Sequence, residues 1–271
     1  MSSSKPISTR PIVPLLLAAI LATACASTGV NRGDVNLVSL EEEWELGRRL
    51  ESDLARELDL VRDPGITRYV SRLGQEIVNT TEMARYPWEF HVVRSRDVNA
   101  FNIPGGHVYV NTGLIAATDS ASELAGVMAH EIAHGVARHG TEQLTKAYGL
   151  NILAGLALGQ NPQAYEQILA QILGTGAMAK FSRDDEREAD YLGVHYMARA
   201  GYHPEGMVSI FRELLRQRQR RPSSVERFFA SHPLTEERIR SVRSYMRELG
   251  DLSGLTRDEP AFRLLHRRVG G

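Results

Sequence analysis

The residues with the clearest capacity for chemistry are two histidines four positions apart, His130 and His134, with Glu131 directly after the first. Positions four apart lie on one face of an α-helix, so both imidazoles can bind the same metal ion. Zinc suits imidazole and carboxylate ligands, and it lowers the pKa of bound water to about 7. Glu131 would lie beside the ion, where it can accept a proton. The motif therefore predicts metal-assisted hydrolysis with Glu131 as the general base.

A catalytic zinc site with two histidines needs a third protein ligand. In one known arrangement the third ligand is a histidine six residues after the second histidine, and a glycine lies three residues after that second histidine. Here the histidine position holds Gly140 and the glycine position holds Ala137, so this arrangement does not apply. Another takes a glutamate from a later helix, and residues 182–194 (SRDDEREADYLGV) offer Glu186 with Asp190 four positions on. On a shared face Glu186 can bind the metal while Asp190 orients a histidine ligand. Such a charge run can also be a solvated helix face, although apolar residues along it favour burial.

The elements that must position these residues follow from capping and apolar spacing. Ser120 with Glu123 predicts a helix that carries the HExxH motif to about His139, a helix-end residue or a polar neighbour of the site. A later helix over about 182–200 carries Glu186. The other expected elements are helices beginning near Ser39, Asp63-Pro64, Pro204 and Thr235, and strands at 88–94 and 107–111 joined through 99–106. Their order indicates an α+β, helix-dominated fold.

Composition narrows the class of protein. The chain has 271 residues, with 32 Lys and Arg against 33 Asp and Glu, for a net charge of −1. Nucleic-acid binders usually carry a basic excess, so we expect no nucleic-acid partner. A single cysteine excludes a disulfide framework and a thiolate-rich metal site.

That cysteine, Cys25, follows a leader with a basic start and an uncharged stretch at 11–24 that is too short to span a membrane. Small residues before Cys25 resemble a bacterial lipobox, so we expect 1–24 to be a signal peptide and 25–38 a lipidated tether. The metallopeptidase domain would then be 39–271. The alternative is ordinary cleavage after Ala24, which leaves a free thiol.

Residues 147–179 carry only one charge, Glu166, and are divided by Pro162. Neither half reaches the length of a membrane span. The stretch is therefore either buried or membrane-facing helix, and we favour burial.

Two segments taken together, HEIAHGVARH and SRDDEREADYLGV, resemble the gluzincin metallopeptidases of the HtpX, BepA and Ste-type prenyl protease family. Further matches are NAFNIPGGHVYVNTGL at 99–114, Gly-Tyr-His-Pro at 201–204 and SHPLTEERI at 231–239. The resemblance implies an α+β, helix-dominated domain with a small β-sheet beside the HExxH helix. It also implies one zinc ion per chain, bound by His130, His134 and Glu186, with Glu131 as base and Asp190 in support.

The resemblance places two further residues, His232 and Arg238, close to the metal. His232 would steady the oxyanion or occupy the open zinc position in a resting form; a turn or capping role is equally compatible with its position. The family also pairs an extended substrate with a sheet edge, through backbone hydrogen bonds. The residues expected at that edge are Gly105, Gly106, His107, Val108, Tyr109 and Val110.

The chain departs from the membrane-spanning relatives and from the one with a helical-repeat domain, and it is most similar to small bacterial lipoprotein members such as LoiP. We therefore expect a membrane-anchored zinc metalloendopeptidase that cleaves envelope proteins in quality control, with envelope assembly machinery as a possible partner. Ala26 after Cys25 favours the outer membrane. The alternatives are a non-catalytic zinc-binding assembly or chaperone-like lipoprotein, and a scaffolding lipoprotein without metal.

Overall fold

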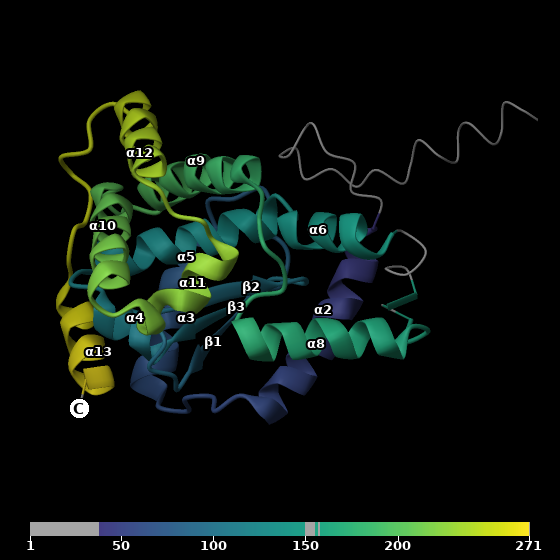
Figure 1. The fold of residues 1–271 in the computed structure, drawn as a ribbon. Helices are drawn as coiled ribbons and strands as arrows, with labels where there is room; N and C mark the ends of the chain where they lie inside the picture. Colours follow the sequence, from purple (N-terminus) through teal and green to yellow (C-terminus); the bar gives the residue numbers. More distant parts are fainter. Residues whose placement is uncertain (1–37, 150–154, 157, 271) are drawn as a thin grey trace, which may run out of the picture.

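The computed structural model describes residues 38–149, 155–156 and 158–270 (Figure 1). The expected signal peptide, Cys25 and nearly all of the expected tether lie outside the described residues. The described part of the chain is helix-dominated with one small sheet, which confirms the expected α+β class.

The sheet has three strands, β1 (Glu89–Val93), β2 (Ala100–Ile103) and β3 (His107–Asn111). Their order is β1-β3-β2, with β1 parallel to β3 and β2 antiparallel to it. The turn from β2 to β3 contains Gly105 and Gly106, whose φ angles are 80° and 78°. This left-handed backbone favours glycine, which has no Cβ to clash.

This topology corrects the expected substrate edge. Strand β3 lies in the centre of the sheet and pairs on both sides, so residues 107–110 cannot accept a further strand. The error has a physical reason. Ala100–Ile103 is only four residues long and three of them are buried, so it lacks the polar–apolar alternation that reveals a half-exposed strand. The pattern therefore predicts a connecting segment where the chain forms the edge strand β2.

The two faces of the sheet pack into different cores. Val108 and Val110 of β3 join the apolar cluster that includes the HExxH helix. Tyr109, between them, points to the other face and joins a second cluster with Leu46 and Leu50 of helix α2 (Leu40–Glu57). Because successive strand residues point to opposite faces, one five-residue strand supports both cores.

Helix α5 (Ala121–Val136) carries the HExxH motif through the protein interior, with fourteen of its sixteen residues buried. It packs against α9 (Arg183–Arg199), α10 (Glu205–Arg220) and α3 (Pro64–Val78). In Figure 1, α9 lies above α5 and the sheet lies between α5 and α8 (Pro162–Thr175). This position among apolar neighbours keeps bulk water away from the motif.

The ends of α5 differ slightly from expectation. Ser120 accepts a hydrogen bond from the Glu123 backbone N–H, as the capping pattern predicts, but the Glu123 carboxylate binds the Asp119 N–H instead of completing a capping box. The helix ends at Val136, earlier than His139, because Arg138 adopts a left-handed conformation with φ 61°. His139 then begins the next helix, α6 (His139–Tyr148).

Further helices in the described part of the chain are α4 (Thr112–Ala117), α11 (Pro222–Ser231), α12 (Glu236–Glu248) and α13 (Pro260–Gly270). Helix α12 begins after the Thr235 cap, and α2 begins near Ser39 as expected, with a Ser39–Glu42 capping box. Helix α13 is not among the elements that the sequence predicts, although its Phe262 and Leu265 are buried against the main core.

The apolar stretch 147–179 is described except for 150–154 and 157. Within it, α8 buries Tyr165, Ile168 and Ile172 in the cluster shared with α2, which supports the burial alternative for this helix. Across the described residues, no helix combines the length and apolar character needed to cross a membrane.

The close packing of α5 against α10 gives a direct test of the fold. A Cβ at Gly126 would lie 2.8 Å from Met207 Cα and 2.9 Å from Met207 N, both backbone atoms that cannot turn away. We expect Gly126→Ala to lower the free energy of unfolding by about 1–3 kcal/mol, measured by urea denaturation. Gly174→Ala is the control, since nothing lies within 4 Å of that Cβ; it should leave stability unchanged or raise it. Equal stability of Gly126→Ala and wild type would contradict the described packing.

Candidate metal centre

Four separate segments bring the predicted site residues together. Helix α5 supplies the two histidines and Glu131, and α9 supplies Glu186 and Asp190. The remaining two are His232, just after α11, and Arg238 in the first turns of α12. All seven side chains are buried, and none of these residues exposes more than 5% of its surface. The pairing of α5 with α9 is what converts two distant motifs into one site.

The ligating atoms of four residues meet at one point. The Nε2 atoms of His130 and His134 are 3.1 Å apart, and the Glu186 carboxylate oxygens lie 3.6 Å and 3.5 Å from them. His232 completes the group with its Nδ1 2.9 Å from Glu186 Oε1. These four residues can hold one metal ion.

The donor set also fits a metal on chemical grounds. Two ligands at about 2.0–2.1 Å from a tetrahedral ion are about 3.3–3.4 Å apart, close to the separations seen here. Two buried imidazole Nε2 atoms that face one another at 3.1 Å, with a carboxylate across from them, are arranged to donate lone pairs to a common cation.

Glu131 lies beside this group and is not part of it. Its Oε1 is 3.4 Å from His232 Nε2 and has no hydrogen-bond partner among the described residues. Burial raises the pKa of the Glu131 carboxyl, although the charges of His232 and His130 oppose that shift. An unpaired carboxylate oxygen beside the ligand group is the geometry that a general base requires.

Arg238 neutralises the carboxylates behind the ligands. Its Nε donates to Asp190 Oδ2 and its Nη2 donates to Asp190 Oδ1, each at 2.7 Å, so the two side chains form a bidentate pair. Its Nη1 contacts Glu186. Burial alone would raise the carboxyl pKa of both residues, but Arg238 lowers that of Asp190, and His232 with Arg238 holds that of Glu186 well below its usual range. Both carboxylates therefore stay ionised in the interior.

Each histidine of the motif has a polar neighbour on its far nitrogen. Asp190 Oδ1 lies 3.1 Å from His130 Nδ1, as the spacing of Glu186 and Asp190 suggested. His139 Nδ1 lies 2.9 Å from His134 Nδ1, so the polar-neighbour alternative for His139 is the one that the structure supports. Such partners set the orientation and tautomer of ligating imidazoles.

Two contributors to the site were missed from the sequence. The Phe181 ring stacks on His134 with the ring centroids 3.9 Å apart, which holds the imidazole plane in place. Asn102 of the edge strand donates from Nδ2 to the Glu131 backbone carbonyl at 3.2 Å and so ties β2 to the HExxH helix. Neither residue belongs to a metal-ligand pattern. For Asn102, the signal that could have found it is its place in segment 99–114, which resembles the family.

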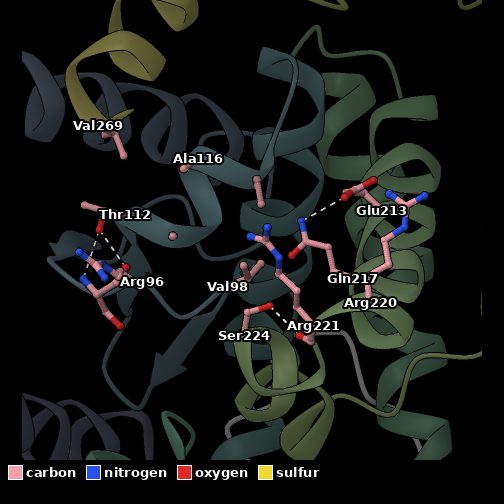
Figure 2. Close-up of a pocket in the computed structure, with 13 residues that line it drawn as sticks. Arg96, Val98, Thr112, Ala116, Glu213, Gln217, Arg220, Arg221, Ser224 and Val269 are labelled. Carbon is pink, nitrogen blue, oxygen red and sulfur yellow. Dashed lines mark hydrogen bonds between the residues drawn. The ribbon is translucent and has the colours of Figure 1, made fainter. Parts of the chain in front are cut away.

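Two surface pockets differ in whether residues of the candidate metal centre line them. A pocket of about 210 Å³ between α9 and α12 reaches Glu186 and Arg238. A second, of about 490 Å³, lies among α4, α10 and α11, and its lining contains none of the predicted site residues. Figure 2 shows Arg96 and Arg221 entering this second pocket from different sides. The two are separate features of the surface.

An HExxH helix joined by a glutamate from a second helix is the ligand arrangement of the gluzincin metallopeptidases, and this is the class that the fold and the site define. Comparison with family models agrees. The model described as peptidase family M48 matches residues 64–246, more than half of the chain. The chain belongs to peptidase family M48.

Individual relatives support this membership. The chain is 30% identical over 219 residues to proteins named β-barrel assembly-enhancing protease in Yersinia pestis and in Escherichia coli K12, an overlap of 76% of this chain and 44% of each relative. It is 31% identical over 221 residues to the mitochondrial metalloendopeptidase OMA1 of Schizosaccharomyces pombe, covering 80% of this chain and 65% of that protein. The chain thus spans less than half the length of the two bacterial relatives.

The role of Arg238 as the neutralising cation can be measured. Arg238→Ala would leave the buried carboxylates of Asp190 and Glu186 without their cation, and breaking a buried pair in this way costs about 3–5 kcal/mol. We therefore expect a loss of that size in the free energy of unfolding, determined in EDTA so that metal binding does not contribute. Arg240→Ala, an exposed position on the same helix, should change stability by less than about 0.5 kcal/mol. Similar stabilities for the two variants would exclude this role.

Proposed function

We propose that this chain is a zinc metalloendopeptidase of the bacterial cell envelope. The observation that carries the proposal is the convergence of His130, His134, Glu186 and His232 on one point, with Glu131 beside it. The family match and the relatives named as proteases support peptide hydrolysis. Zinc is the proposed ion because imidazole nitrogen with carboxylate oxygen is its usual ligand set.

The chain's own residues divide the reaction between them. Bound at this centre, a divalent ion would supply a Lewis acid for the scissile carbonyl and for water. Glu131 accepts the proton of the attacking water as the oxygen–carbon bond forms. It then returns the proton to the amine nitrogen as the carbon–nitrogen bond breaks, so that a carboxylic acid and an amine leave. Asp190 and His139 hold the imidazoles in position throughout.

His232 has two proposed roles that depend on the state of the site. Its Nδ1 lies 3.3 Å from His130 Nε2, so His232 would complete the ligand set in a resting form. An open catalytic zinc site keeps that position for water or substrate. Alternatively, since its second nitrogen lies 3.4 Å from Glu131 Oε1, His232 would steady the developing oxyanion.

The edge strand β2 is the proposed docking edge for an extended substrate. The Asn111 N–H donates to the Asn99 carbonyl, and the alternation of antiparallel pairs then points the backbone groups of Ala100 and Asn102 away from β3. Asn102 is half-buried and its side chain binds the Glu131 carbonyl. A peptide strand that pairs here would run beside the metal ligands and be bound with little side-chain preference.

We further propose that envelope proteins are the substrates, in protein quality control, and that Cys25 carries a lipid anchor to the outer membrane. The leader and small residues before Cys25 support the anchor, and the name β-barrel assembly-enhancing protease supports an envelope setting and a link to assembly machinery. Residues 39–271 would form the peptidase domain behind a tether at 25–38.

The general-base assignment is tested with Glu131→Gln, which keeps the size of the side chain and removes its basicity. We expect kcat/KM on casein or a fluorogenic peptide to fall by at least about 100-fold, while zinc content by mass spectrometry stays at the wild-type level. Glu166→Gln, at an exposed position of α8, should retain full activity. If wild type cleaves no more than Glu131→Gln does, the cleavage does not come from this centre, and the alternative of a non-catalytic zinc-binding assembly or chaperone-like lipoprotein replaces the proposal.

The anchor is tested with Cys25→Ser, since an acyl chain attaches through the thiol and not through a hydroxyl. We expect the variant to move from the membrane fraction to the soluble fraction after cell disruption, while Ser27→Ala stays with the membranes. Membrane retention of Cys25→Ser would place the attachment elsewhere in the chain.

A further inference from the structure

We propose that Glu89, His91 and His107 form a second metal site, separate from the centre on α5, which takes a divalent first-row transition ion such as zinc. Glu89 and His107 are direct partners in the β1–β3 register, and His91 lies two residues further along β1. Because side chains two positions apart share a face of a sheet, all three project from the same face. The side chains can hold one metal ion between them.

The two carboxylate-to-imidazole distances are close to those between ligands of one metal ion, and the three ligand atoms all lie within 4.8 Å of one another. Glu89 Oε2 lies 3.8 Å from His91 Nε2 and 3.9 Å from His107 Nδ1. The corresponding carboxylate-to-imidazole distances at the α5 centre are 3.5 Å and 3.6 Å. A contraction of a few tenths of an ångström therefore brings Glu89 to the spacing of two ligands on one ion. Glu89 is largely exposed and can make this movement by side-chain rotation alone.

The two imidazole nitrogens have no other partner among the described residues. His91 Nε2 and His107 Nδ1 are both buried atoms without a hydrogen bond, and the His107 side chain is only 5% exposed. A buried polar atom left unpaired costs about 1–3 kcal/mol, so such atoms usually have a ligand. Here two of them point toward the same carboxylate.

The groups around the cluster favour a bound cation, because they keep the two imidazoles neutral and restrict their rotation. Burial lowers the pKa of both His91 and His107 to about 4, so both are neutral near pH 7 and offer lone pairs. Glu51 lies close by, and burial together with the charge of Glu89 raises its pKa. The His91 ring stacks on Tyr109 at a centroid distance of 4.6 Å, which limits its freedom to turn away.

This cluster is distinct from the centre on α5. His107 and Tyr109 alternate with Val108 and Val110, which face α5, so the proposed site lies on the face of the sheet that packs against α2. The Glu89 side chain is 57% exposed and that of His91 is 14% exposed, so an ion can reach the cluster from solvent. An ion bound here would join β1 to β3 through side chains and so stabilise the sheet that carries the edge strand β2.

The test is zinc stoichiometry of the purified full-length chain. We expect two zinc ions per chain by mass spectrometry after equilibration with zinc and removal of the excess. His91→Gln with His107→Gln should reduce this to one ion, while His195→Gln, elsewhere on α9, keeps two. His134→Ala with Glu186→Ala should lose the other ion and keep this one, which separates the proposal from the proposed catalytic function.

Glu89→Gln provides a variant that preserves the fold, because its side chain is 57% exposed. We expect it to weaken the second zinc by at least about tenfold in titration calorimetry, with Glu57→Gln on α2 unchanged. The second zinc should also raise the melting temperature of wild type and not that of the double His variant. One zinc per chain in wild type, or two in the double His variant, would overturn the proposal.

Discussion

The metal centre depends on how the interior compensates three buried carboxylates, those of Glu131, Glu186 and Asp190. Ionised carboxylates are costly to bury unless cations and hydrogen bonds surround them. Arg238 meets this requirement from a single position, because its planar guanidinium pairs with Asp190 through two nitrogens and contacts Glu186 through the third. The carboxylates of Glu186 and Asp190 therefore stay ionised beside the two histidines of the motif. Glu131 lacks a hydrogen-bond partner for one oxygen among the described residues, which suits proton transfer.

The scaffold explains why this charge pattern can be held rigidly. Helix α5 is buried on nearly all sides, and α9 packs along it so closely that a Cβ at Gly193 would lie 3.3 Å from the His130 backbone nitrogen. That close approach brings Glu186 and Asp190 to the two sides of the His130 ring. On the opposite side, Asn102 connects α5 to the edge strand. The same small sheet separates the α5 core from the core of α2 and α8 and exposes a different set of side chains to each.

Several elements could be predicted because their signals are local. The caps at Ser39 and Ser120, the helix that carries Glu186 and the strands on either side of 99–106 follow from residue types within one or two turns. The site residues on α5 and α9 were predictable because metal ligation imposes a spacing on one helix face. The edge strand β2 was not, because a short and mostly buried segment has no alternation. Helix α13 and the contact of Phe181 with His134 depend on partners distant in the chain, for which there is no local pattern.

Residue types and spacings predicted a hydrolytic metal centre at His130, Glu131 and His134, and the resemblance to a known family added Glu186 and Asp190. Membership of peptidase family M48 agrees with this prediction. Other features required the folded chain. Packing placed β3 in the centre of the sheet, brought His139 against His134, and set His91 and His107 around Glu89. The physical reason is the distance along the chain between the residues that interact. Spacing along a helix is fixed by the 3.6-residue turn, whereas strand order and side-chain meetings across elements arise from packing, which no local pattern records.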